Sequence, residues 1–441
     1  MKDKTDNKNL STVNQTISGL TAHERQRRNI LKGATAITAA STTFGAPLLW
    51  AQNIKDVTLR QFGTGVSNLN DVAAKVKEDL GFTLEMTALD SDSVAQRAAT
   101  QPKSFDIADI EYWICKKVWP AGNLQPMDTS KIDNYDKIVG IFRNGKLTPE
   151  SVIAQGTAPH SVGFVDGPDG KEFVDNESGW MTLIPTIYNA DTLGIRPDLI
   201  DEEINTWAQL LDPKYKGKAS ILDISSIGIM DAAMVCEAMG EITYADKGNM
   251  TREEIDKTMA IMTEAKKNGQ FRAFWKSFDE SVNLMASGEV VIQSMWSPAI
   301  TAVRAKGIPC VYQPLKEGYR SWGGGLGLSR NLSGLELDAA YEYINWYLSG
   351  WVGGYLMRQG YYSAVPETSK NFMSEDEWGY WFEGKPSQGD IVNPQGVKME
   401  GPGAVRDGGS FNDRMGSVAC WNAVMDENQY MVRKWNEFIA A

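Results

Sequence analysis

The stretch that decides the fold is SGEVVIQSMW, residues 287–296, together with the SPAITAVRAKG that follows it. Its VVI run at 290–292 favours a β-strand. Ser297 and Pro298 are typical of the N-cap and the first position of a helix. The stretch therefore predicts a strand that leads directly into a helix, with Trp296 at the carboxyl end of the strand. Open α/β sheets bind their ligands at that end, which makes Trp296 a candidate binding residue.

Strand and helix patterns alternate on both sides of this stretch. Before it, β-favouring runs at 57–62, 83–88 and 105–110 are separated by helical periodicity after 68 and over 91–101. A second series has a strand at 219–223, a helix opening at Ser225 or Ser226, a capping box that opens a helix over 251–267, and a helix over 281–287. This order predicts an α/β fold with parallel strands.

Two extended segments are expected to connect two lobes. The first is WMTLIPTIY at 180–188, whose Pro185 argues against a central place in a sheet. The second is the glycine-rich EGYRSWGGGLGL at 317–328, which carries Trp322. We expect residues 52–181 with 323–370 to form lobe 1, and residues 182–322 with 371–441 to form lobe 2. A ligand cleft between lobes joined by such crossovers closes about a hinge.

The first 51 residues have the order of an export signal. A polar segment leads to Arg27-Arg28 and then to a short, mildly apolar run rich in Ala and Thr. This order predicts a twin-arginine signal peptide and a periplasmic location. Without residues 1–51 the net charge changes from −12 to −16, a balance that disfavours nucleic acid and anionic lipid as partners. No apolar run is long enough to span a bilayer. We expect a monomer without stable membrane insertion.

The number and positions of the cysteines and histidines limit which disulfides, metal sites and catalytic triads this sequence can form. The four cysteines are well separated, so three disulfide pairings or free thiols all remain open: Cys115, Cys236, Cys310 and Cys420. Beyond the signal the only histidine is His160. A histidine-based zinc site would need more ligands, and a serine-hydrolase triad would have to use His160. An exported hydrolase stays an alternative that would use His160 or a pair of carboxylates, and no cofactor is expected.

Aromatic side chains near the ends of predicted strands and helices are the main candidates for a binding site. Ring faces attract organic cations, each contributing about 0.5–2 kcal/mol, and a carboxylate would supply the counter-charge. The candidate residues are Glu111, Trp113, Trp180, Asp223, Ser225, Trp296, Trp322, Tyr361 and Tyr362.

Three further patterns each permit two interpretations. The GTGVS loop at 63–67 is either an ordinary tight turn or a cradle of N–H groups for an anion. Arg320 and Arg414 either pair with an anionic group or lie on the surface, and the surface is favoured. The tandem Tyr361-Tyr362 permits a ferric-iron carrier, because phenolates bind ferric iron.

Several segments together resemble the periplasmic solute-binding proteins of ABC importers, in their spermidine/putrescine-binding branch. They are FDIADIEYW at 105–113, TWAQLLDPKYKGKASILD at 206–223, ASGEVVIQSMWSPAI at 286–300 and GYYSAVPE at 360–367. The resemblance implies a two-lobed binding protein without catalysis, which captures a solute and delivers it to a membrane permease. It also implies that Trp113, Trp296, Trp322 and Tyr361 wall the ligand and that Glu111 is a polar contact.

The chain departs from the polyamine-binding pattern at three places. Residues 63–67 replace an aromatic-rich loop, Ile224 and Ile227 stand in place of an acidic pair, and Gly324 replaces an aspartate. A diamine needs a carboxylate at each end, because an unpaired buried ammonium is costly. We therefore expect a compact cation or zwitterion, such as an amine, a quaternary ammonium or sulfonium compound, or an opine-like compound. Polyamine binding proper remains the alternative.

Overall fold

The computed structural model describes residues 54–441. The chain divides into two units, Met1–Asp56 and Val57–Ala441, and of the first only the short 3-10 helix Ile54–Asp56 is described. The export signal predicted for residues 1–51 lies outside the described residues. Within residues 54–441, no helix combines the length and the hydrophobicity needed to cross a membrane.

The N-terminal part of the second unit is a parallel α/β layer. Strand β1 (Thr58–Thr64) pairs in parallel with both β2 (Thr83–Leu89) and β3 (Ile107–Glu111). Helices α3 (Asn70–Asp79) and α4 (Ser91–Thr100) pack on these strands. Apolar residues at helical spacing anchor α3, since Val72 and Val76 are both fully buried. The strand–helix order predicted for this part is confirmed.

A second parallel layer follows the same plan. Strand β11 (Ala219–Leu222) lies between β12 (Phe271–Trp275) and β13 (Ile292–Met295), in parallel with both. Its helices are α7 (Ser225–Ala238), α8 (Arg252–Lys267), α9 (Phe278–Ser287) and α10 (Ser297–Arg304). The predicted capping box of α8 is present at Thr251 and Glu254. The C-terminal helix α16 (Asn428–Ala440) packs against α7 and α8 and adds Trp435 to their core.

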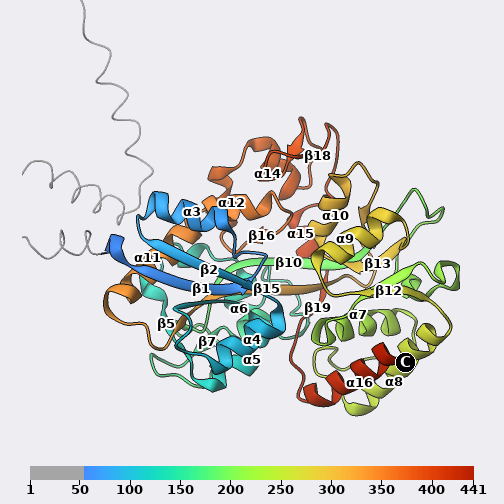
Figure 1. The fold of residues 1–441 in the computed structure, drawn as a ribbon, viewed down its shortest axis with the longest axis horizontal. Coiled ribbons are helices and arrows are strands. Elements are labelled where there is room, and N and C mark those ends of the chain that lie inside the picture. The colour runs from blue at the N-terminus through green and yellow to red at the C-terminus, as the bar shows by residue number, and fades with distance from the viewer. Residues whose placement is uncertain (1–53) are drawn as a thin grey trace, which may run out of the picture. The chain divides into compact units, whose positions relative to one another are not determined.

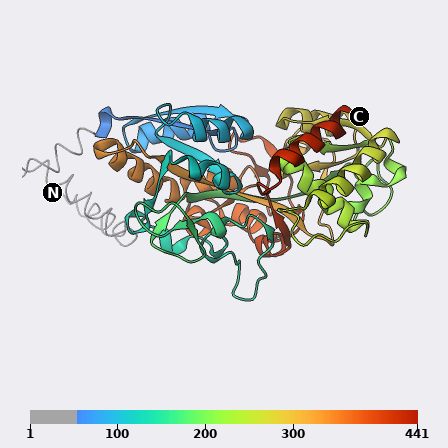
Figure 2. The same cartoon turned by 90° about the horizontal axis from the view of Figure 1, so that it is seen from below.

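Two long antiparallel strands join the layers. They are β10 (Ile184–Ile195) and β15 (Tyr319–Ser329), and they lie side by side in the sheet order β12-β11-β13-β10-β15-β3-β1-β2. Figure 1 shows both strands running across the middle of this unit, with β1 and β2 at one end and β12 at the other. Figure 2 shows the same two groups of elements from below. The predicted lobe boundaries lie just before β10 and inside β15.

Two sequence-based expectations about this region need correction. Strand β10 is central despite Pro185, because the pairing with β15 shifts register between Pro185 and Ile187; a bulge tolerates the missing N–H. The strand and helix around Trp296 are confirmed, but their limits differ. The strand begins at Ile292, and the N-cap of α10 is Trp296, with Ser297 as the first helical residue.

Shorter elements complete the unit. Residues 162–174 contain an antiparallel hairpin formed by β7 and β8. Residues 412–438 combine helices with a strand, β19, which pairs with β15. The remaining bounds are β4 (Leu124–Gln125), β5 (Met127–Asp128), α5 (Cys115–Val118), α6 (Gly140–Asn144), β6 (Gln155–Gly156), β7 (Phe164–Val165), β8 (Phe173–Val174), β9 (Trp180–Met181), β14 (Val311–Tyr312), α11 (Gly334–Leu348), α12 (Trp351–Met357), β16 (Tyr362–Ser363), α13 (Pro366–Ser369), α14 (Glu375–Trp381), β17 (Ile391–Val392), β18 (Lys398–Glu400), α15 (Phe411–Met415) and β19 (Val418–Trp421).

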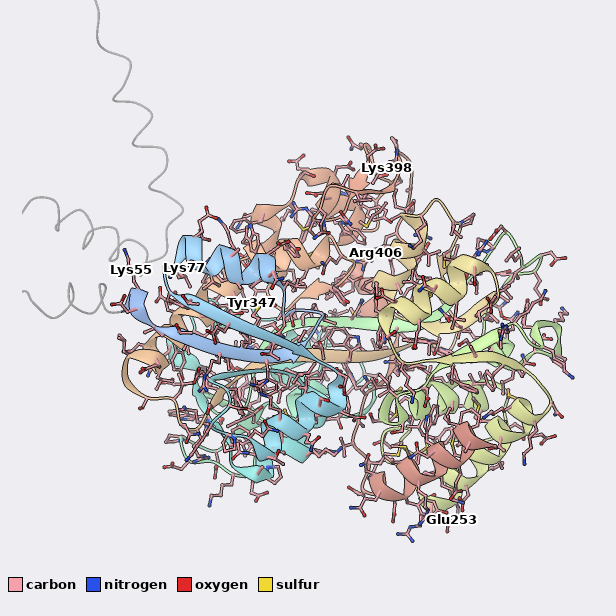
Figure 3. The ribbon with its side chains drawn as sticks, viewed as in Figure 1. Lys55, Lys77, Glu253, Tyr347, Lys398 and Arg406 are labelled. Atoms are coloured by element: carbon pink, nitrogen blue, oxygen red, sulfur yellow. The ribbon has the colours of Figure 1, made fainter. Side chains whose placement is uncertain are left out.

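The segment from α14 to β18 has a small core of its own, which includes Met357 from α12. Arg304 of α10 anchors the C-terminal end of this segment through ion pairs with Glu400 (2.8 Å) and Asp407 (2.7 Å). Figure 3 shows Lys398 at the outer edge of this segment and Arg406 further in. Arg406 is buried, and its guanidinium lies 4.5 Å from the Tyr362 ring centre.

The four cysteines are all free and buried, which answers the question of their pairing: Cys115, Cys236, Cys310 and Cys420. Burial raises the pKa of Cys236, Cys310 and Cys420 to about 12. Thiols that stay protonated in apolar surroundings are structural and unreactive.

Candidate functional site

A cavity of about 680 Å³ lies at the carboxyl ends of the parallel strands of both layers. Strands β1, β2 and β3 bring Thr64, Asp90 and Glu111 to its wall, and β11 and β13 lead to Ile224 and Trp296. Parallel strands end at a common edge, and open α/β sheets bind ligands there. Two such edges therefore share one cavity.

The joining strands supply the wall between these edges. Asp191 of β10 and Arg320 and Trp322 of β15 line the cavity. The register pairs Asp191 with Arg320 across the two strands, and Arg320 and Trp322 are two residues apart. Side chains at period two point to the same face of a sheet, so the fold aims all three at one side.

Arg320 sits in a buried charge cluster. Its Nε donates to Asp231 Oδ1 (2.6 Å), its Nη1 donates to Asn422 Oδ1 (3.0 Å), and Nη1 lies 3.3 Å from Asp191 Oδ2. Asp191, Asp231 and Arg320 are each at most 1 % exposed. Burial raises the pKa of Asp191, to about 6, and also raises the pKa of Asp231. Two carboxylates around one guanidinium leave an excess of negative charge.

The surface position favoured for Arg320 and Arg414 is wrong. Both are 1 % exposed. Arg320 is buried because Asp191 and Asp231 compensate its charge. Arg414 donates to the carbonyls of Asp407 (3.0 Å) and Ala190 (3.3 Å), and its guanidinium lies 5.0 Å from the Tyr312 ring centre.

Aromatic rings from three elements face the cavity. Trp296, Trp322 and Tyr361 all line it, and Trp322 meets Tyr361 edge to face with ring centres 6.0 Å apart. Trp296 is held by Trp275, whose ring stands at 89° to it at 4.8 Å. Rings fixed in this way offer preformed faces to a cationic guest.

Glu111 is the acidic candidate that lines the cavity. It ends β3 at the cavity wall, accepts from Trp113 Nε1, and accepts from Ser91 Oγ at 3.3 Å. Burial raises the pKa of Glu111 to about 7, although these hydrogen bonds and Arg320 act in the opposite direction. A carboxyl in this state gains from a positive charge placed beside it.

Four of the nine candidate residues line the cavity, and five do not. Glu111, Trp296, Trp322 and Tyr361 are brought together. Trp113 lies behind the wall as a hydrogen-bond donor to Glu111, and Trp180 lies in the separate sheet β5-β9-β7-β8. Asp223 accepts from Trp435 Nε1 (2.7 Å) and pairs with Lys276 (3.1 Å). Ser225 begins α7, and Tyr362 is fully buried between Tyr188 and Phe411.

Several cavity residues were missed by the sequence analysis. Asp191 had a usable signal, because it is a charged residue inside the otherwise uncharged strand IPTIYNADTLGI. Asn422 follows β19, a strand that was not predicted. Asn393 and Gln395 come from the loop between β17 and β18, and Met399 belongs to β18. No local sequence pattern identifies these four residues as site residues, because only long-range packing brings them to the cavity.

Comparison with known proteins identifies the family. Residues 71–401 match the family model described as bacterial extracellular solute-binding protein. The chain belongs to this family. Its members are extracellular proteins that bind solutes.

Solved structures agree with this assignment at the level of fold. A putative spermidine/putrescine ABC transporter protein from Listeria monocytogenes is 13% identical with a TM-score of 0.59, covering 87% of this chain and 98% of its own. A spermidine/putrescine substrate-binding protein from Streptococcus pneumoniae is 16% identical with a TM-score of 0.53, covering 73% and 86%. A binding protein from A. tumefaciens R10, in complex with agropinic acid, is 14% identical with a TM-score of 0.54, covering 87% and 99%.

These likenesses show that this solute-binding protein has the two-lobed α/β fold of periplasmic binding proteins, with a cleft between lobes joined by two extended crossovers. The fold class and the family predicted from sequence are confirmed. No curated protein sequence matches the chain.

Proposed function

We propose that this chain is the substrate-binding component of an ABC importer that captures a small organic cation or zwitterion. The observation that carries the proposal is the pairing of two carboxylates, Glu111 and Asp191, with the rings of Trp296, Trp322 and Tyr361 in one cavity. The carboxylates provide counter-charge and the rings provide apolar, electron-rich walls. An amine, a quaternary ammonium or sulfonium group, or the cationic end of an opine-like compound meets both requirements.

The charge of the cavity supports a positive guest. Four acidic residues line it (Asp90, Glu111, Asp191 and Asp279), against the two basic residues Lys276 and Arg320. The negative charge of Asp191 is one of the influences that raise the pKa of Glu111. A cation between these two carboxylates would stabilise both in their ionised forms.

The far wall of the cavity favours one cationic centre over two. There the second layer presents Ile224 and Ile227, and its charged residues Lys276 and Asp279 are both exposed. On the opposite side the Asp90 carboxylate is engaged by Ser93, which donates from its backbone N (2.9 Å) and its hydroxyl (2.6 Å). Because a second buried ammonium would need its own carboxylate, polyamine binding proper is the less favoured candidate.

A ferric-iron carrier and an exported hydrolase both have less support. A ferric site would need Tyr361 and Tyr362 to converge, but Tyr361 lines the cavity while Tyr362 packs against Phe411 with ring centres 5.0 Å apart. A hydrolase that uses a histidine as its base would need His160 in the cavity. His160 instead lies in the 3-10 helix Pro159–Val162, outside the cavity lining.

Export and delivery complete the proposal. The twin-arginine signal would place the protein in the periplasm, where it would pass its solute to the permease subunits. Replacing Arg27 and Arg28 by lysine should keep the precursor in the cytoplasm, as fractionation and immunoblotting would show. Processing that is unchanged by these substitutions would contradict a twin-arginine route.

Binding is tested by a thermal-shift screen over amines, quaternary ammonium compounds, betaines, opine-like amino acids, putrescine and spermidine, followed by titration calorimetry. We expect a compact cation to bind at micromolar or tighter dissociation constants, which corresponds to about 8 kcal/mol. Tight putrescine binding with no binding of monocations would reverse the preference. Binding of anions alone would refute the proposal.

A further inference from the structure

Asn422 is a buried residue that lines the cavity, and its amide nitrogen has no hydrogen-bond partner within residues 54–441. It follows β19, is fixed by the hydrogen bond from its backbone N to the Ser321 carbonyl (2.8 Å), and is 1 % exposed. It lines the cavity, and among the described residues nothing accepts a hydrogen bond from its Nδ2. A buried polar group without a partner costs free energy that a bound ligand can recover.

The orientation of this amide is determined by its neighbour. Arg320 Nη1 lies 3.0 Å from Asn422 Oδ1, and a guanidinium can only donate hydrogen bonds. The oxygen of the amide must therefore face Arg320, so the NH₂ group stays free for another acceptor. Arg320 is itself held by Asp231 at 2.6 Å, which prevents the pair from rearranging freely.

The charges around Asn422 determine which acceptor suits it. Two carboxylates flank the guanidinium of Arg320. Asp191 Oδ2 lies 3.3 Å from its Nη1, and Asp231 Oδ1 lies 2.6 Å from its Nε. A ligand carboxylate at Asn422 would be placed beside this negative excess and would be repelled. A neutral oxygen accepts the same hydrogen bond without that penalty.

We infer that Asn422 is a specificity-determining residue that selects cations bearing a neutral oxygen acceptor, a hydroxyl or a carbonyl. The inference rests on the proposed function and names its ligand class more closely. The cationic group would lie against Glu111, Trp322 and Tyr361, and the oxygen would accept from Asn422 Nδ2. An isosteric cation without the oxygen would leave this donor unpaired.

The test uses matched pairs of cations in titration calorimetry on the full chain. The pairs are choline with propyltrimethylammonium, ethanolamine with propylamine, and acetylcholine with (4-methylpentyl)trimethylammonium. Glycine betaine serves as the carboxylate arm. In the pair that binds most tightly, we expect the oxygen-bearing member to bind at least about tenfold more tightly than its partner.

Two variants remove the donor in different ways. Asn422→Asp keeps an oxygen for Arg320 Nη1, and Asn422→Leu removes the donor without adding charge. The matched control is Asn393→Asp, which adds the same charge to the cavity wall. Asn393 Oδ1 only accepts from the backbone N of Gln395 (3.0 Å) and Val397 (2.9 Å), so an aspartate can replace it.

The oxygen preference should disappear in both Asn422 variants and persist in Asn393→Asp. Equal binding of the two members of each pair to the wild type would overturn the inference, as would a preference that survives in Asn422→Leu. Tighter binding of glycine betaine than of choline would overturn the choice of a neutral oxygen. If no amine or ammonium compound binds, the proposed function fails and the inference fails with it, which is a different result from equal binding.

Discussion

Asp191 and Arg320 face each other across the two strands that join the halves of the molecule. The register of β10 and β15 makes them direct partners, Arg320 Nη1 lies 3.3 Å from Asp191 Oδ2, and both side chains are 1 % exposed. Both also line the cavity. The two joining strands are thus part of the cavity wall and carry its most deeply buried charges.

Replacing Asp191 by asparagine should weaken the binding of a cationic ligand about 10- to 100-fold, because one charge-assisted contact is lost. Asp231→Asn is the matched control, since Asp231 pairs with the same guanidinium but does not line the cavity. Both variants leave Arg320 with one carboxylate instead of two, so any effect on the free energy of unfolding should be similar in the two. Calorimetry and urea unfolding separate the effects, and equal loss of affinity in the two variants would argue against a direct contact from Asp191.

Ligand affinity should depend on pH through Glu111, whose pKa burial raises to about 7. Below that pH the carboxyl is protonated and loses the charge that attracts a cation. The affinity should therefore fall as the pH is lowered, by up to about tenfold per pH unit. In Glu111→Gln the slope between pH 8 and 6 should flatten, and a residual slope below pH 6 should come from Asp191. An unchanged profile in this variant would exclude Glu111 from the site.

The stability of the ligand-free protein should also depend on pH, through Asp109. This carboxyl is 5 % exposed, and burial raises its pKa to about 7 against the opposing hydrogen bond from Ser67. Between about pH 4 and 7 the native state holds a proton that the unfolded chain has released, so the free energy of unfolding falls as the pH rises. Asp109→Asn should relieve this penalty, by up to a few kcal/mol at pH 8 and by little at pH 4.

The control for this measurement is Asp90→Asn, which should show the opposite sign. Hydrogen bonds from Ser93 lower the pKa of Asp90, so its ionised form is favoured in the native state. Urea unfolding at pH 4.5 and pH 8 distinguishes the two variants. A stabilisation by Asp109→Asn that is equal at both pH values would show that its charge is not the cause.

Trp322 and Trp180 were both expected at the binding site, and the structure separates them. Trp322→Leu should weaken the binding of a cation about 3- to 30-fold, which corresponds to one ring face at 0.5–2 kcal/mol. Trp180→Leu should leave affinity unchanged, because Trp180 belongs to the small sheet with β5 and β7. Calorimetry on both variants tests the assignment, and a similar loss of affinity in Trp180→Leu would contradict it.

The local patterns identified most of the fold. The capping box at Thr251, the strand before Trp296 and the parallel strand–helix series were predictable, because caps and periodicity act within a few residues. The place of Pro185 in a central strand was not predictable, because a bulge in the pairing with β15 decides it. Strand β19 was missed, since its pairing with β15 joins segments about a hundred residues apart.

The site was predictable where a residue ends a strand and is aromatic or charged, as with Glu111 and Trp296. It was not predictable for Trp113, because the ring turns into the interior and reaches the cavity only through its hydrogen bond to Glu111. Tyr361 and Tyr362 show the same limit. Adjacent residues at the end of a helix looked equivalent, but one lines the cavity and the other is packed against Phe411.

By itself the sequence determined the α/β order, the two crossovers and the aromatic character of the strand ends, because hydrophobic periodicity and helix caps are local properties. Only the tertiary structure decided that Asp191, Arg320 and Asn422 meet at one wall of the cavity. Arg320 and Asn422 are 102 residues apart in the chain, and the backbone pairing of β15 with β10 and β19 brings them together. Such pairing depends on the register of whole strands, which no short stretch of sequence specifies.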